Sequence, residues 1–310
     1  MNKRLAKKIN FHLKDFKFRI RTNKKFKFLP IFIIGLPRSG STFFHQILIS
    51  KFNFNYISNI KAFFYENVVL GNLLHNKLSL DTNFKSNFIS KFGNTFGPLE
   101  PNEWGWFWRK WFNLKNDEHH ISRKVDWKNL KKELLKIESI NESPILFDTP
   151  FINGNLDKFI SNIGPVLIFN LERVHTSVYK SLLNARIKKY GTLNKYYGAH
   201  TKENEILSIR NPYNQVFQQV KTLHQEKEDM LRLVAKDNIC SINYEDLVKE
   251  PMKEIKKIQR FLKKQNILIA VNNITLPKFI NRNSIPLKSD YLNNDYKKYY
   301  KYIQNLWLKN

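Results

Sequence analysis

The chain has 310 residues, of which 42% are apolar and 14% aromatic, and this composition excludes a wholly disordered protein. The single cysteine, Cys240, excludes an intramolecular disulfide framework and a zinc cluster of several thiolates, and it favours a reducing compartment. The formal net charge of +27 has two interpretations. One is an anionic partner, such as nucleic acid, an acidic membrane, a sulfated glycan or a phosphate-rich cofactor; the other, which we favour for most of the excess, is a general bias toward Lys, Asn, Ile and Phe.

Residues 1–28 are the most basic part of the chain, with eleven Lys or Arg residues against one acid, Asp15. This pattern is typical of a basic arm or a short surface helix, and we favour a solvated face over a nucleic-acid clamp, with peripheral contact with an anionic membrane left open. The longest early apolar run, 30–36, is shorter than the roughly 18 residues that span a bilayer and too short for a signal-peptide core. We therefore expect a cytoplasmic protein with a basic arm at 1–28 and a single domain at 29–310.

In chain order, short apolar runs alternate with longer helical patterns. The expected elements are a strand at 30–36, a helix at 41–51, strands at 145–148 and 166–171, helices at 174–190 and 212–235, a strand at 238–244 and a helix from Pro251 to Leu262. Fully apolar strands flanked by helices indicate a parallel sheet that is covered on both sides. The predicted fold class is therefore α/β, with three layers around a central parallel sheet and a P-loop-like topology.

The turn after the first strand, residues 35–42, has the sequence Gly-Leu-Pro-Arg-Ser-Gly-Ser-Thr and leads directly into a helix. Converging backbone N–H groups and the helix dipole make such a turn an anion site. Its spacing matches the nucleotide P-loop at Gly35, Gly40 and Thr42, but Ser41 stands where the P-loop has its lysine. A kinase uses that lysine and Mg²⁺ to hold a triphosphate, whereas Arg38 and several hydroxyls suit a shorter 5′-phosphate group without a metal.

This loop resembles the phosphosulfate-binding loop of the sulfotransferases, in the arginine-bearing version of bacterial and glycan- or tyrosine-directed members. Those enzymes use 3′-phosphoadenosine 5′-phosphosulfate (PAPS) as donor, so the resemblance implies PAPS as co-substrate and no metal. It implies that Arg38 also stabilises charge on the transferring group. The residues that would bind the 5′-phosphosulfate are Pro37, Arg38, Ser39, Gly40, Ser41 and Thr42.

Two further segments carry the same resemblance in family order. Arg173 follows the strand at 166–171 and Ser181 comes eight residues later, as in the pair that binds the 3′-phosphate, although Val174-His175 replaces the usual Asp-Pro. The segment Tyr244-Glu-Asp-Leu247 matches the one whose tyrosine lies near the adenine. We expect Glu245 and Asp246 to anchor the helix entry rather than to act as catalytic acids.

The segment 96–111 is the strongest candidate for the acceptor side, because it holds four of the six tryptophans and two carboxylates. Desolvation among aromatic side chains raises a carboxyl pKa toward a useful range, so we predict Glu103 as the general base, with Glu100 second. Two other interpretations stay open: a core tryptophan cluster with a structural Glu103, or an aromatic wall for the acceptor.

The histidines are weaker candidates. His45, one turn into the first helix, is a possible alternative base, although a packed or solvated histidine is the simpler interpretation. His175 and His224 carry less weight. We expect the adjacent pair His119-His120 to be solvated, since no carboxylates at ligand spacing complete a metal site.

One departure from the family concerns the end of the strand at 145–148. Many members have a lysine just after this strand, whereas Asp148 stands here. Either another cation replaces it, namely Arg109, Lys110 or one between 278 and 288, where Lys278, Arg282 and Lys288 occur, or the activity is reduced.

The leading hypothesis is a PAPS-dependent sulfotransferase that acts on a hydroxyl or amine of a glycan, a lipid or a small metabolite. A P-loop kinase or nucleotidase is disfavoured by the missing lysine, and turnover of Mg-ATP would revive it. A non-catalytic protein that binds nucleic acid or membrane is favoured only by the charge.

Overall fold

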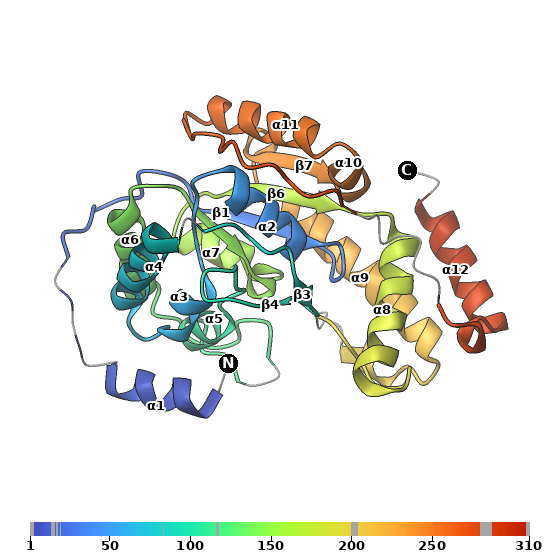
Figure 1. The fold of residues 1–310 in the computed structure, drawn as a ribbon. Helices are drawn as coiled ribbons and strands as arrows, with labels where there is room; N and C mark the ends of the chain where they lie inside the picture. The colour runs from blue at the N-terminus through green and yellow to red at the C-terminus, as the bar shows by residue number, and fades with distance from the viewer. Residues whose placement is uncertain are drawn as a thin grey trace.

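The computed structural model describes residues 3–13, 16, 18, 20–82, 84–115, 118–199, 204–279 and 287–307. Its centre is a five-stranded sheet in the order β2-β5-β1-β6-β7 (Figure 1). Every pairing within this sheet is parallel, which confirms the predicted sheet. The strands are β1 (Ile31–Gly35), β2 (Asn55–Tyr56), β5 (Ile145–Asp148), β6 (Leu167–Glu172) and β7 (Ile239–Asn243).

Helices cover both faces of the sheet, as predicted. Along β1 the side chains alternate, so that Phe32 and Ile34 join one buried apolar cluster and Ile31 and Ile33 join another. The first cluster is covered by α3 (Asn59–Phe63), α4 (Val68–Thr82), α5 (Gly105–Trp111), α6 (Trp127–Asn141) and α7 (Leu156–Asn162). The second is covered by α2 (Ser41–Lys51), α10 (Tyr244–Lys249) and α11 (Pro251–Lys264). The three-layer α/β fold is therefore confirmed.

A third apolar cluster joins α8 (His175–Tyr190), α9 (Pro212–Leu231) and α12 (Asn294–Trp307), and α9 also reaches the first cluster through Met230 (Figure 1). A small antiparallel hairpin, β3 (Ser90–Lys91) and β4 (Asn94–Thr95), stands apart from the main sheet. Helix α9 ends at Leu231 rather than at 235, because the backbone N–H groups of Leu233 and Val234 turn back onto the carbonyls of Met230 and Leu231.

The described part of residues 1–28 is held against the rest of the chain. Helix α1 (Lys3–Leu13) buries Ala6, and its Asn10 side chain donates to the Phe63 carbonyl at 2.7 Å and accepts from the Glu66 N–H at 2.9 Å. The N–H groups of Lys27 and Phe28 donate to the buried Glu138 carboxylate. Among the described residues, no helix is both long and apolar enough to span a bilayer.

Candidate active site

The loop after β1 lies at the carboxyl edge of the sheet, where β1 has β5 on one side and β6 on the other. The strand order changes direction at this point, and open parallel sheets bind ligands there. Gly40 has a φ of +99°, and a Cβ added to it would lie 2.8 Å from the Tyr244 ring. Only glycine allows this backbone conformation and this close approach, so the loop is shaped by both glycine and the tyrosine that packs on it.

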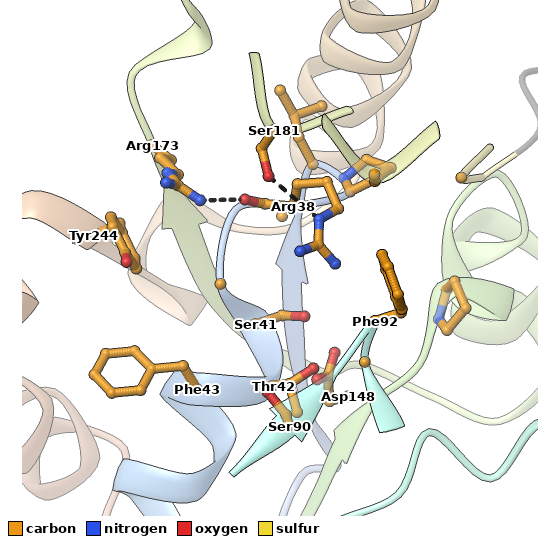
Figure 2. Close-up of a pocket in the computed structure, with 18 of the residues that line it drawn as sticks. Arg38, Ser41, Thr42, Phe43, Ser90, Phe92, Asp148, Arg173, Ser181 and Tyr244 are labelled. Atoms are coloured by element: carbon orange, nitrogen blue, oxygen red, sulfur yellow. Dashed lines mark hydrogen bonds between the residues drawn. The ribbon is translucent and has the colours of Figure 1, made fainter. Parts of the chain in front are cut away.

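The second junction, at the end of β6, is bonded directly to this loop. Arg173 donates to the backbone carbonyl of Arg38 at 2.6 Å and lies with its guanidinium 4.3 Å from the centre of the Tyr244 ring. The Arg38 side chain in turn donates to the Ser181 hydroxyl of α8 at 3.3 Å, as Figure 2 shows. The structure therefore brings together the residues of three sequence segments that are far apart in the chain.

These residues face a cavity of about 1010 Å³. The predicted donor residues that line it are Pro37, Arg38, Gly40, Ser41, Thr42, Arg173, Ser181 and Tyr244. Ser39 is the exception: it is buried behind the loop, and its hydroxyl oxygen has no hydrogen-bond partner among the described residues. Ser39 shapes the turn instead, because its backbone N–H donates to the Leu36 carbonyl at 3.0 Å.

Two acids line the described cavity wall, Glu103 and Asp148. Burial and the neighbouring Asp148 carboxylate raise the pKa of Glu103 to about 8. Burial raises the pKa of Asp148 to about 7, although the hydrogen bond from the Ser41 hydroxyl acts in the opposite direction. Burial disfavours the ionised form of both groups and the Asp148 carboxylate adds to this for Glu103, so both stay protonated to higher pH than free carboxyls, and Glu103 to higher pH than Asp148.

Glu100 is not brought to the cavity. It is buried, and its carboxylate accepts hydrogen bonds from the Gln46 side chain at 2.8 Å, the Ser86 hydroxyl at 3.0 Å and the Asn87 N–H at 2.7 Å. These three bonds tie the segment before the hairpin to α2. The structure therefore gives Glu100 a role in positioning the chain rather than contact with the cavity.

His45 also lies away from the cavity. It is buried in α2, where its ring meets Tyr56 edge to face at 6.0 Å and where burial lowers its pKa to about 3. The expectation that His119 and His120 are solvated is wrong. Both are half-buried because the segment folds onto the domain, and the His119 ring lines the cavity and stacks on Phe151 at 5.5 Å.

The tryptophan-rich segment belongs to the core. Trp104, Phe107 and Trp108 are buried in the first apolar cluster, where Trp104 and Trp108 pack on Phe147 of β5 and Phe107 stacks on Trp104. They form no aromatic wall, and of the segment 96–111 only Glu103 lines the cavity.

Of the cations proposed to replace the family lysine, Lys278 lines the cavity. Arg109 instead donates to the backbone carbonyls of Lys115 and Glu118, and Lys110 pairs with Glu66. Lys288 is exposed and does not line the cavity, and Arg282 lies outside the described residues.

Sequence reasoning missed three lysines of α8 that line the cavity, Lys180, Lys188 and Lys189. The signal was present, because Ser177, Ser181, Asn184, Ala185 and Lys188 follow the spacing of one helix face and line the cavity together. The hairpin tip, Phe92-Gly93, also lines the cavity and had no counterpart in the sequence patterns. Within the described ranges, no three His, Cys, Asp or Glu side chains gather into a group that could hold a metal ion.

Residues 169–298 match the model of the family described as "Sulfotransferase domain". The matched range contains Arg173, Ser181 and Tyr244, so it covers the second and third segments of the predicted donor site. The match confirms the resemblance to the sulfotransferase family. A sequence search of curated proteins finds no match.

Solved structures of proteins described as sulfotransferases are distantly similar to this chain. A sulfotransferase from Mycobacterium tuberculosis H37Rv is 12% identical with a TM-score of 0.49, over 88% of this chain and 71% of that one. The sulfotransferase domain from the curacin biosynthetic pathway is 14% identical with a TM-score of 0.45, over 91% and 99%. The sulfotransferase domain of the Synechococcus PCC 7002 olefin synthase is 17% identical with a TM-score of 0.43, over 92% and 98%. Structural similarity at this level of identity and TM-score does not define an activity for this chain.

Proposed function

We propose that this protein transfers the sulfuryl group of PAPS to a hydroxyl or amine acceptor. The observation that carries the proposal is the link between the two strand ends, where Arg173 is bonded to the loop that holds Arg38 in one cavity. Two guanidinium groups at fixed positions, one on a glycine-turned loop, suit a ligand with two separate phosphate groups. The family match over residues 169–298 supports the same class of reaction.

The cavity fits a nucleotide of this kind. Its volume of about 1010 Å³ is at the upper end of the roughly 300–1,000 Å³ typical of small-molecule sites. Arg38, Ser41 and Thr42 would hold the 5′-phosphosulfate, and Arg173 and Ser181 the 3′-phosphate. Tyr244 offers a ring for the adenine, and its close packing on Gly40 fixes the wall of that subsite.

When bound, PAPS supplies an activated sulfuryl group. The chain supplies two carboxyl groups that line the cavity, Glu103 and Asp148. We assign proton removal from the acceptor to Glu103, which becomes ionised as the pH rises toward its pKa of about 8 and is then a strong base for a carboxylate. Arg38 and the loop N–H groups stabilise negative charge at the transfer point.

Calorimetric titration with 3′-phosphoadenosine 5′-phosphate, beside AMP and Mg-ATP, tests the donor site directly. We expect binding that requires the 3′-phosphate and needs no metal. Arg38→Ala should weaken this binding at least about tenfold, because it removes a charge-assisted contact to phosphate. The matched control is Arg232→Ala, which removes an exposed guanidinium paired with Asp229 on the surface.

Two results contradict the proposal. Preferential binding of Mg-ATP moves the protein to the kinases, despite Ser41 in place of the P-loop lysine. If none of the three nucleotides binds, the cavity is not a donor site.

The proposal includes a cytoplasmic location. Cys240 is free and buried, which supports a reducing compartment. Cell fractionation of the tagged full chain, with recovery in the soluble fraction, is the expected result.

A further inference from the structure

The cavity continues along α8 well beyond the predicted donor residues. Lys188 and Lys189 line it seven and eight residues after Ser181, which places them about 10–12 Å further along the helix. The wall at this end is completed by the rings of Tyr190, Tyr196 and Tyr197. We refer to Lys188, Lys189 and these three tyrosines as the lysine–tyrosine end.

Lys189 is held in place by aromatic rings. Its ammonium lies 4.7 Å from the centre of the Tyr197 ring and 5.3 Å from that of Tyr190. Such cation–π contacts attract a lysine without neutralising its charge. Lys188 and Lys189 are exposed at the rim of the cavity, and in the part of the chain that the structure describes no carboxylate lies within ion-pair distance of either.

The hairpin tip separates this end from the donor loop. The Phe92 ring lies 5.8 Å from the Arg38 guanidinium and 5.9 Å from the Tyr197 ring, so it stands between the two (Figure 2 shows it beside Arg38). Phe92 and Gly93 both have positive φ, as in the tight two-residue turn of a hairpin, which holds the tip in a defined shape. A ligand group at the lysine–tyrosine end therefore lies beyond Phe92 from the phosphosulfate loop.

We infer that the acceptor of this enzyme carries an anionic group, which binds at the lysine–tyrosine end while its hydroxyl or amine lies near Glu103. The inference rests on the proposed function. Lys188 and Lys189 select for a carboxylate, phosphate or sulfate on the acceptor, and the tyrosine rings pack against the part that joins this group to the reacting atom.

Three matched probes test this: 4-nitrophenyl β-glucoside, its 6-phosphate and 4-nitrophenyl β-glucuronide, which share one scaffold and differ in charge. Each is titrated into protein saturated with 3′-phosphoadenosine 5′-phosphate. We expect the two acidic probes to bind roughly tenfold tighter than the neutral one, and the preference to shrink as salt is raised. The phosphate and carboxylate arms show which anion the site prefers.

The decisive variant is Lys188→Gln/Lys189→Gln, which keeps two good helix formers and removes two charges. It should lose the preference for acidic probes while its affinity for the neutral probe and for 3′-phosphoadenosine 5′-phosphate stays unchanged. Lys24→Gln/Lys25→Gln is the control, since it removes the same charge from an exposed adjacent pair that does not line the cavity.

The outcomes are distinguishable. If the wild-type protein does not bind the nucleotide, the proposed function is wrong. If the nucleotide binds normally but the three probes bind with equal affinity, or none of them binds, the inference about the acceptor is wrong while the proposed function stands. A double variant that weakens nucleotide binding as much as Ser181→Ala assigns the lysines to the donor site and likewise overturns it.

Discussion

Asp148 shows how much a single residue changes this site. The resemblance to the family places a lysine after the second main strand, but this chain has an acid there, and folding brings it beside Glu103. A cation at that position would lower the pKa of Glu103, whereas Asp148 raises it. The site thus has a more basic carboxylate and one fewer positive charge near the transfer point.

The raised pKa of Glu103 has a consequence for stability. The folded state holds a proton on this group between its ordinary pKa of 4.5 and its raised value of about 8, while the unfolded state releases it. Since the folded state binds more protons in this window, the free energy of unfolding falls as pH rises through it. Glu103→Gln should therefore flatten this decline, in urea unfolding measured at pH 5 and pH 8.5.

The control for this measurement is Glu142→Gln, which changes an exposed carboxylate on the surface. The same pH slope in Glu103→Gln and in the wild type would show that Glu103 is not the group responsible.

Activity gives an independent check on the same residue. Glu103→Gln should leave binding of 3′-phosphoadenosine 5′-phosphate unchanged and lower turnover on the order of a hundredfold, as loss of a general base does. The base assignment fails if the variant turns over at the wild-type rate.

At the scale of elements, the glycine-turned loop between β1 and α2 depends on a partner from α10. Gly40→Ala would place a methyl group 2.8 Å from the Tyr244 ring at a φ of +99°. We expect it to move either the loop or the tyrosine and to weaken nucleotide binding at least about tenfold.

Gly164→Ala is the matched control, because its φ of +134° is also strained for alanine but a Cβ there meets nothing within 4 Å. It should lower the midpoint of thermal unfolding without reducing the affinity for the nucleotide. Similar affinity losses in both variants would attribute the Gly40 effect to backbone strain alone.

The elements also show what the sequence could predict. β1, β5 and β6 were recognisable because each is a mostly apolar run, and β7 because its Ile239, Cys240 and Ile242 are apolar; predicted donor residues directly follow β1, β6 and β7. β2 and the β3–β4 hairpin have two-residue strands with no apolar pattern. The Glu103–Asp148 pair and the contact of Phe92 with Tyr197 join segments that are distant in the sequence, so no local spacing predicts them.

At the scale of the whole molecule, the excess positive charge still has two interpretations, and α1 allows a test. Its packed face holds Ala6 and Asn10, and its outer face exposes Lys7, Lys8 and the Phe11 ring. We expect Lys7→Gln/Lys8→Gln to weaken sedimentation with phosphatidylserine vesicles roughly tenfold or more, since each lysine near such a surface contributes about 1 kcal/mol.

Lys256→Gln/Lys263→Gln on the exposed side of α11 removes the same charge and is the control. An equal loss in both variants, or no vesicle binding by the wild type, would favour compositional bias over a dedicated membrane surface.

The bond from Arg173 to the Arg38 carbonyl joins residues 135 positions apart, and the one from Arg38 to Ser181 joins residues 143 apart. Parallel pairing over such separations forms slowly, and a chain is synthesised from its N-terminus. A chain still growing on the ribosome therefore exposes residues 35–42 long before β6 exists. It carries the arginine, the glycines and the hydroxyls of the loop, but it lacks the contacts from Arg173 and Ser181 until β6 and α8 dock beside β1 and its loop.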